Sequence, residues 1–167
     1  MKAIYLIGFM GAGKTTVGRA LAEKMRCPFY DSDQTVVERT GRSIPQLFDE
    51  VGEDGFRDLE QQALQSLPIE NCIIATGGGI ILREDNRKYM KEKGTVIWLH
   101  ANPTEIIKRL ETDSSRPLLS GNKEEQIVQL YQKRVNLYKL AADLQVHTDR
   151  KTKMEITEEI LMKITIN

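Results

Sequence analysis

The segment Gly8–Thr16, which reads GFMGAGKTT, constrains this chain more than any other part of its sequence. It fits the pattern G-x-x-x-x-G-K-[ST] of a phosphate-binding loop. Its glycines let the backbone turn tightly and bring N–H groups against phosphate oxygens, because no Cβ stands in the way. A helix predicted to begin near Lys14 adds the positive end of its dipole. The charge of Lys14 suits the β- and γ-phosphates of a nucleotide, and the Thr15 hydroxyl suits Mg²⁺.

Apolar runs alternate with amphipathic stretches along the chain, and this order is typical of a parallel sheet with helices on both faces. A length of 167 residues is enough for one domain with a full-sized core. We therefore expect a single α/β domain, residues 1–167, built as a three-layer sandwich. The strands are expected near residues 3–7, 28–31, 72–75, 95–99 and 144–147. The helices are expected near residues 14–25, 34–40, 43–50, 53–66, 84–92, 103–111, 124–141 and 153–163.

Charge and composition exclude several classes of partner. Lys plus Arg and Asp plus Glu number 24 each, so no overall field favours nucleic acid or a membrane surface. The apolar run before Gly8 is too short for a signal peptide or a membrane span, which predicts a cytoplasmic protein. Cys27 and Cys72 are isolated, and neither a CxxC motif nor a metal-like histidine cluster accompanies them. We expect both to be buried thiols in a reducing compartment.

Four segments directly follow predicted strands, at the edge where open parallel sheets bind ligands. These segments are Gly8–Thr15, Asp31–Asp33, Thr76–Gly79 and His100–Pro103. Three of the four carry glycines or polar side chains that suit phosphate transfer.

Asp31 and Asp33 are two residues apart at the end of a predicted strand, so their carboxylates are expected to point to the same side. One would serve a magnesium ion through its water ligands, and the other a substrate hydroxyl. Asp31 is the best substitute for the aspartate of a Walker-B strand. The alternative is a helix N-cap, where Asp is favoured. The phosphate loop one strand away favours the functional interpretation.

Two arginines carry further information. In the predicted helix 124–141, Arg134 lies within an apolar stripe, where a charge needs an internal acid or an anionic ligand. Arg57 and Glu60 are three residues apart on one helix face, so Glu60 can hold Arg57 as a two-pronged donor for a ligand carboxylate. The alternative for each arginine is a solvated or ion-paired side chain.

Two other segments are less specific. The triple glycine Gly77–Gly79 allows close approach of a ligand, and it also suits a flexible turn. The polar segment 111–123 is long for a connection between helices. With Arg116 it suits a lid that closes over nucleotide phosphates and excludes water.

The chain as a whole resembles the shikimate kinase family, in the P-loop group that includes nucleoside-monophosphate kinases. The motifs are G-x-M-G-A-G-K-T-T at 8–16, F-Y-D-S-D at 29–33, T-G-R-S-I at 40–44, G-F-R-x-x-E at 55–60, A-T-G-G-G at 75–79, R-P-L-L at 116–119 and R-x-x-x-Y-x-x-x-A-D at 134–143. The phosphate loop alone marks a superfamily, whereas this set in this order is specific to the family. The resemblance implies a five-stranded parallel sheet of order 2-3-1-4-5, a substrate-binding region near 32–60 and a lid near 111–123.

The resemblance also implies an activity and the residues that carry it. ATP, with Mg²⁺, would phosphorylate the 3-hydroxyl of shikimate in a monomeric enzyme of aromatic amino-acid biosynthesis. The implied ATP-binding residues are Gly11, Ala12, Gly13, Lys14, Thr15, Thr16, Arg109, Arg116 and Lys151. The implied shikimate-binding residues are Asp33, Arg57, Glu60, Gly77, Gly78, Gly79 and Arg134. Thr15 would ligate the metal and Asp31 would support it through water. The implied catalytic residues are Lys14, Asp33 and Arg116, with Asp33 as candidate base. The proline that many relatives carry near the adenine is absent from 148–154, so Arg150 stays an alternative to Lys151.

Two rival classes stay open on the sequence. One is a kinase of the same group that acts on gluconate or a nucleoside monophosphate, although the paired basic residues favour a carboxylated polyol. The other is a nucleotide-dependent switch or a non-catalytic binding module. The segment 122–125 reads NKEE and does not complete the guanine motif N-K-x-D. ADP release from ATP with and without shikimate distinguishes all three classes.

Overall fold

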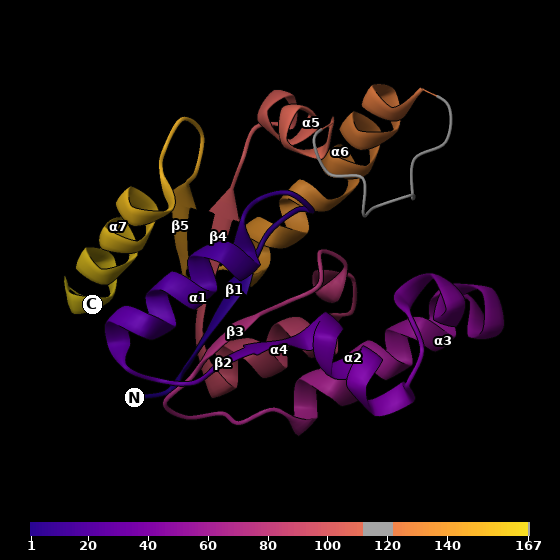
Figure 1. Cartoon of the computed structure of the whole chain (residues 1–167), viewed down its shortest axis with the longest axis horizontal. Coiled ribbons are helices and arrows are strands. Elements are labelled where there is room, and N and C mark those ends of the chain that lie inside the picture. The colour runs from indigo at the N-terminus through magenta and orange to yellow at the C-terminus, as the bar shows by residue number, and fades with distance from the viewer. Residues whose placement is uncertain (112–121, 167) are drawn as a thin grey trace.

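The computed structural model describes residues 1–111 and 122–166. Within them, five parallel strands form one sheet in the order β2-β3-β1-β4-β5, as expected (Figure 1). Across the sheet the strands are β2 (Phe29–Asp31), β3 (Ile73–Ala75), β1 (Ala3–Ile7), β4 (Gly94–His100) and β5 (Leu144–His147). All five residues of β1 are buried, since it is the central strand and both of its faces are covered.

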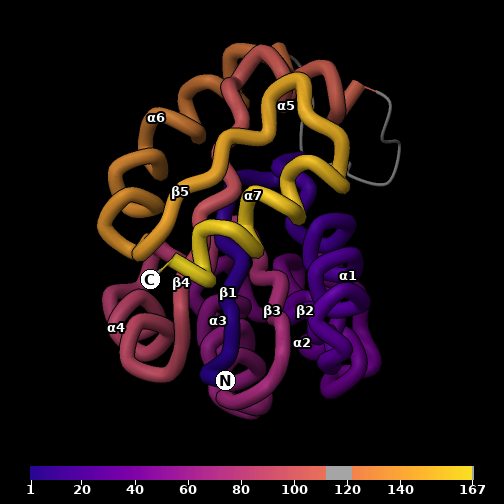
Figure 2. The backbone as a smooth tube through the Cα atoms, turned by 90° about the vertical axis from the view of Figure 1, so that its left-hand side faces the viewer, coloured from indigo at the N-terminus to yellow at the C-terminus, as the bar shows by residue number. Residues whose placement is uncertain are grey.

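Helices cover both faces of the sheet (Figures 1 and 2). In chain order the helices are α1 (Lys14–Met25), α2 (Ser32–Thr40), α3 (Ile44–Ser66), the short 3₁₀ helix η1 (Ile80–Leu82), α4 (Glu84–Lys93), α5 (Pro103–Glu111), α6 (Lys123–Ala141) and α7 (Lys153–Ile166). These bounds follow the predicted ones closely, because apolar periodicity and glycine or proline breaks are local properties of the sequence. In the described part of the chain, no helix is both long and apolar enough to cross a membrane.

Alternation along β1 divides the core into two layers. Ile4 and Leu6 pack with α1 and α7, whereas Tyr5 and Ile7 pack with α4, α6 and the end of α3. Successive side chains of a strand point to opposite faces, so one short run of apolar residues supplies both layers. Trp98 of β4 belongs to the second layer. The sheet therefore lies between two core layers.

Helices α2 and α3 form a small apolar unit of their own beside β2. Val36, Leu47, Phe56 and Ala63 are buried together there. The sequence predicted two helices, at 43–50 and 53–66, where the structure has one helix with non-helical φ/ψ at Gly52. The predicted break and the observed kink coincide, since glycine tolerates the positive φ that bends the chain.

Two expectations need correction. The helix that follows β2 begins at Ser32, not at Gln34, so Asp33 lies in its first turn and not at a strand end. Of the two cysteines, Cys72 is buried as expected, but Cys27 is only half-buried.

Candidate active site

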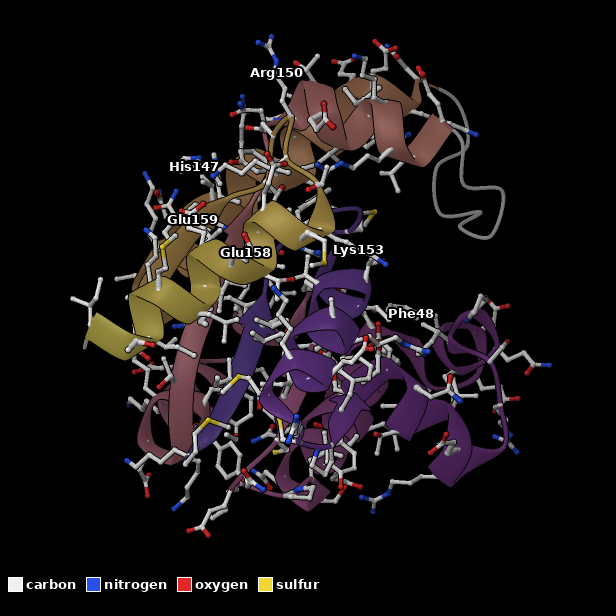
Figure 3. The ribbon with its side chains drawn as sticks, turned by 60° about the vertical axis from the view of Figure 1, so that its left-hand side comes forward. Phe48, His147, Arg150, Lys153, Glu158 and Glu159 are labelled. Carbon is white, nitrogen blue, oxygen red and sulfur yellow. The ribbon has the colours of Figure 1, made fainter. Side chains whose placement is uncertain are left out.

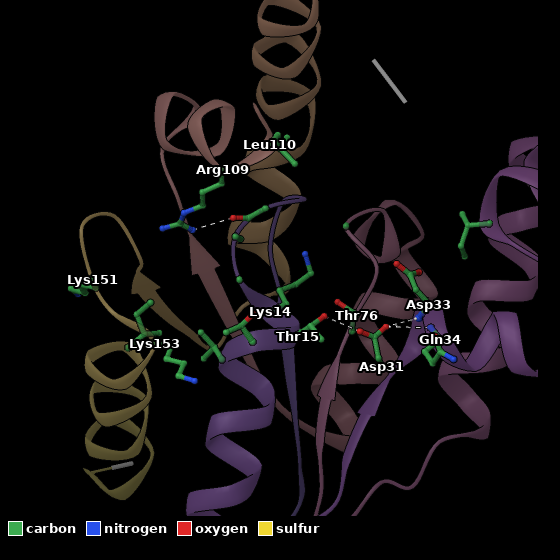
Figure 4. A pocket seen from close by; sticks show the side chains of 18 of the residues that line it. Lys14, Thr15, Asp31, Asp33, Gln34, Thr76, Arg109, Leu110, Lys151 and Lys153 are labelled. Atoms are coloured by element: carbon green, nitrogen blue, oxygen red, sulfur yellow. Dashed lines mark hydrogen bonds between the residues drawn. The ribbon is translucent and has the colours of Figure 1, made fainter. Parts of the chain in front are cut away.

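A cavity of about 650 Å³ opens where β1, β2 and β3 end (Figure 4). Its walls are the phosphate loop with the start of α1, the start of α2, the turn after β3, the end of α5 and the start of α7. Every residue predicted to bind ATP that lies in the described ranges lines this cavity: Gly11, Ala12, Gly13, Lys14, Thr15, Thr16, Arg109 and Lys151. Arg116, and most of the lid predicted at 111–123, lie outside the described residues.

The phosphate loop has the shape that its sequence predicts. Gly11 and Gly13 have φ values of 78° and 94°, which other residues rarely adopt. Gly13 is the N-cap of α1 and provides no side-chain cap, so the first turn of α1 keeps N–H groups for an anion. Lys14 Nζ donates to the carbonyl oxygens of Gly8, at 2.7 Å, and Phe9, at 3.0 Å. Its ammonium group therefore lies over the loop.

Asp31 combines both roles considered for it. Its Oδ1 accepts from the backbone N–H groups of Asp33, at 3.1 Å, and Gln34, at 3.3 Å, and so caps α2. Its Oδ2 accepts from the Thr15 hydroxyl at 2.9 Å (Figure 4). One carboxylate therefore joins the phosphate loop to the helix that presents Asp33, and the N-cap and site interpretations do not exclude each other.

The triple glycine packs tightly against charged side chains. A Cβ at Gly77 would lie 2.6 Å from Asp33 Oδ1 and 2.6 Å from Glu60 Oε1, and a Cβ at Gly79 would overlap the Arg57 guanidinium. The Gly77 N–H also donates to the Ser32 hydroxyl at 3.1 Å. The turn is thus tightly packed, and the missing Cβ atoms let two acids and an arginine approach it.

Arg57 is buried and fixed. Its Nη1 donates to Glu60 Oε2 at 2.9 Å, and Glu60 is 1% exposed. The Arg57 guanidinium carbon lies 5.4 Å from the ring centroid of Phe56 and 5.9 Å from that of Phe48, and the two rings stack. The ion pair and the rings hold the guanidinium in one orientation, so this arginine is ion-paired, as the alternative allowed, and not solvated.

Arg134 of α6 converges on the same place. It is 8% exposed, as its position in an apolar stripe predicted, and its Nε has no hydrogen-bond partner among the described residues. Burial raises the pKa of Glu60; the positive charges of Arg57 and Arg134 oppose the rise, and Asp33 adds to it. The two arginines and the two acids, Glu60 and Asp33, therefore interact electrostatically. Arg57 also pairs with the exposed Glu53 at 3.5 Å. Two buried guanidinium groups at one place, with a single buried carboxylate, suit an anionic ligand.

Tyr138 is a site residue whose polar role the sequence did not reveal. Its hydroxyl donates to the Gly78 carbonyl oxygen at 2.6 Å and so supports the triple glycine from α6. Burial raises the pKa of Tyr138, so the hydroxyl remains a donor at neutral pH. The helical stripe predicted burial of Tyr138, but the polar contact spans 60 residues of sequence. Phe48 and Phe56 were also missed; their rings stack with one residue on each side of the kink at Gly52.

Arg109 and Lys151 occupy the opposite end of the cavity. Arg109 donates from Nη1 to the Gly11 carbonyl oxygen, at 3.1 Å, and from Nη2 to the Thr148 carbonyl oxygen, at 3.1 Å. Lys151 pairs with Glu159 at 2.5 Å. Lys153, which the sequence did not single out, lines the cavity as well. Three basic side chains thus face the end of the cavity away from Asp33 (Figure 4).

A parallel sheet of order 2-3-1-4-5, a phosphate loop after its central strand and an acid facing that loop define a P-loop kinase. The family model described as shikimate kinase matches residues 10–165. The chain belongs to the shikimate kinase family.

Relatives and solved structures agree with this assignment along the whole chain. A shikimate kinase of Enterococcus faecalis is 41% identical over 166 residues, which cover 98% of this chain and 99% of the relative. A shikimate kinase from Acinetobacter baumannii, solved in complex with shikimate, has a TM-score of 0.94 and 38% identity, over 100% of this chain and 94% of that one. A shikimate kinase from Bacteroides thetaiotaomicron has a TM-score of 0.90 and 34% identity, over 98% of each chain.

Proposed function

We propose that this enzyme transfers the γ-phosphoryl group of ATP to the 3-hydroxyl of shikimate, giving shikimate 3-phosphate and ADP in aromatic amino-acid biosynthesis. One observation carries the choice of acceptor: the buried pair of arginines, Arg57 and Arg134, shares its surroundings with Asp33 beside the phosphate loop. An acceptor with both a carboxylate and a hydroxyl group can bind the two arginines through the first and Asp33 through the second. The Acinetobacter baumannii relative, solved with shikimate, supports the same acceptor.

On the donor side, residues Gly11–Thr16 bind the ATP phosphates through backbone N–H groups and the Lys14 ammonium. The Thr15 hydroxyl and the Asp31 carboxylate lie 2.9 Å apart and are hard oxygen donors, which fits Mg²⁺. Thr15 would hold the ion directly and Asp31 through its water ligands. When bound, Mg²⁺ neutralises charge on the β- and γ-phosphates.

On the acceptor side, Arg57 and Arg134 bind the shikimate carboxylate, and Glu60 positions Arg57. Gly77, Gly78 and Gly79 let the substrate ring approach the backbone. Asp33 then orients the 3-hydroxyl. The hydroxyl oxygen bonds to the γ-phosphorus as its proton passes to Asp33. The bond from the γ-phosphorus to the bridging oxygen breaks, and its electron pair leaves with ADP.

Three basic residues complete the proposal. Arg109 and Lys151, which line one end of the cavity, would contact the adenine, and Arg116, outside the described residues, would bind the phosphates. We also propose that the enzyme acts as a monomer in the cytoplasm, where ATP is available.

Steady-state ADP release tests the acceptor. We expect release from Mg²⁺-ATP to depend on shikimate, and the phosphorylated product to carry its phosphate on the 3-hydroxyl by ³¹P–¹H correlation. Release that requires gluconate or a nucleoside monophosphate would indicate a different kinase of the P-loop group. Release at the same rate without an acceptor would indicate a nucleotide-dependent switch.

A further inference from the structure

The chain has two histidines, and the fold brings them together. His100 ends β4 and His147 ends β5, and the two are register partners in the sheet. Their Nδ1 atoms face each other at 2.9 Å. The sequence shows no histidine cluster, because only the pairing of β4 with β5 joins these residues, which are 47 positions apart.

The outer nitrogen of each ring has a polar neighbour. His100 Nε2 lies 2.7 Å from the Tyr131 hydroxyl, and His147 Nε2 lies 3.3 Å from the Gln145 amide. A half-turn of that amide places its oxygen there, since the O and N positions of an amide are assigned from the hydrogen-bond pattern. A histidine that ligates a metal through one nitrogen usually donates the other N–H to such a neighbour. Both rings are thus oriented with Nδ1 toward a shared point.

Asp149 supplies a third donor. Its two carboxylate oxygens accept from Asn102, Oδ1 from the backbone N–H at 2.9 Å and Oδ2 from the side-chain amide at 2.6 Å. Ligand atoms of His100, His147 and Asp149 all lie within 4.8 Å of one another. A carboxylate has about four lone-pair positions, so these two bonds leave Asp149 able to bind a cation. Asn102 then orients the Asp149 carboxylate, in the same way that Tyr131 orients the His100 imidazole.

We propose that His100 Nδ1, His147 Nδ1 and an Asp149 carboxylate oxygen bind a divalent transition-metal ion of the zinc class. Two imidazole nitrogens around tetrahedral Zn²⁺ lie about 3.3 Å apart. The rings need to separate by only about 0.4 Å from their hydrogen-bonded distance to meet that geometry. His147 is exposed at the surface beside the loop that leads to α7 (Figure 3), so the fourth position is open to water. Two nitrogen donors favour Zn²⁺, Co²⁺ or Ni²⁺ over Mg²⁺, which prefers oxygen.

The site is separate from the Thr15–Asp31 pair but contacts the residues around the nucleotide cavity. Thr148 lies between two of the proposed ligands, and its carbonyl oxygen accepts from Arg109. Arg109 in turn donates to Gly11 of the phosphate loop. A bound ion therefore links the end of β4 to the start of the segment after β5. That segment carries Lys151 and Lys153.

Nuclear magnetic resonance on the untagged, full-length, chelator-treated protein tests the site directly. With two histidines in the chain, long-range ¹H–¹⁵N spectra contain two imidazole systems. Addition of one equivalent of Zn²⁺ should shift both Nδ1 resonances to the metal-bound range and leave both Nε2 atoms protonated. A large excess of Mg²⁺ should not reverse the change. Coordination through Nε2, a response of one ring only, or displacement by Mg²⁺ would overturn the proposal.

Variants identify the ligands. Because His147 is exposed, His147→Ala should keep the unfolding temperature measured in chelator and weaken Zn²⁺ binding in calorimetry at least about tenfold. Asp149→Asn should weaken binding about tenfold, whereas Asp85→Asn, at an exposed acid on α4, should leave it unchanged. Co²⁺ should give the visible spectrum of a tetrahedral site without thiolate charge transfer. Equal affinity in all variants, or a thiolate band from Cys27 or Cys72, would refute the assignment.

Discussion

Replacement of Arg57 by methionine tests the electrostatic reasoning about the acceptor site. The change removes the guanidinium but keeps an unbranched apolar side chain against Phe48 and Phe56. Two effects should follow. One is loss of a charged hydrogen-bonding partner for the acceptor carboxylate, and the other is a buried Glu60 without its 2.9 Å partner.

The expected magnitudes follow from these contacts. A hydrogen bond to a charged group contributes about 1.5–3 kcal/mol, so the KM for shikimate should rise about ten- to 150-fold. The KM for ATP should stay the same, because Arg57 is not among the residues that line the nucleotide cavity. Breaking a buried ion pair costs about 3–5 kcal/mol of unfolding free energy, whereas Arg83→Met, which breaks a partly exposed pair with Asp58, should cost far less.

The pH dependence of that stability loss is the sharper test. Burial already raises the pKa of Glu60, and Arg57 opposes the rise. The Glu60 pKa should therefore be higher still in the Arg57→Met variant. A carboxyl group whose folded pKa exceeds its unfolded pKa stabilises the fold fully below the unfolded value. That stabilisation is lost as pH rises through the folded value. The destabilisation should therefore grow from acidic to neutral pH in denaturant unfolding.

The double variant Arg57→Met/Glu60→Gln should remove this pH trend, because glutamine does not ionise. A pH-independent loss in the single variant, or an unchanged shikimate KM with a raised ATP KM, would refute the role given to the Arg57–Glu60 pair.

Three further predictions concern the phosphate loop, the acceptor base and the triple glycine. Lys14→Met should lower kcat about 10²- to 10³-fold. The unfolding temperature serves as the control, because the change also removes two hydrogen bonds within the loop. Turnover near the wild-type rate would exclude the role of Lys14 in charge neutralisation. Asp33→Asn should lower kcat about 10²- to 10⁴-fold and remove the acidic limb of the pH–rate profile. A retained acidic limb would limit Asp33 to orienting the hydroxyl. Gly79→Ala should raise the shikimate KM with little change in the ATP KM, because the new Cβ would overlap the Arg57 guanidinium. In the matched control Gly41→Ala, the new Cβ meets no atom within 4 Å. The control should leave the shikimate KM unchanged, although the positive φ of Gly41 makes the change slightly destabilising.

Local features of the sequence predicted the helices, the strands and part of the site. The phosphate loop and the helix after it were predicted in place, because glycine spacing and apolar periodicity act over a few residues. The strand order came from resemblance to a family, since nothing local states which strands are neighbours. Asp31 shows the limit: residue type alone left the cap and site roles as alternatives, whereas the Thr15 contact across 16 positions combines them.

The sequence by itself determined where the chain turns, which stretches are helical or extended, and which side chains can bind phosphate. Only the tertiary structure decided that Arg57 lies against Gly79, that Tyr138 supports Gly78, and that His100 meets His147. The physical reason is that each of these contacts depends on sheet order and helix packing. Burial of apolar surface from the whole chain sets that packing, so the pattern around any one residue does not contain it.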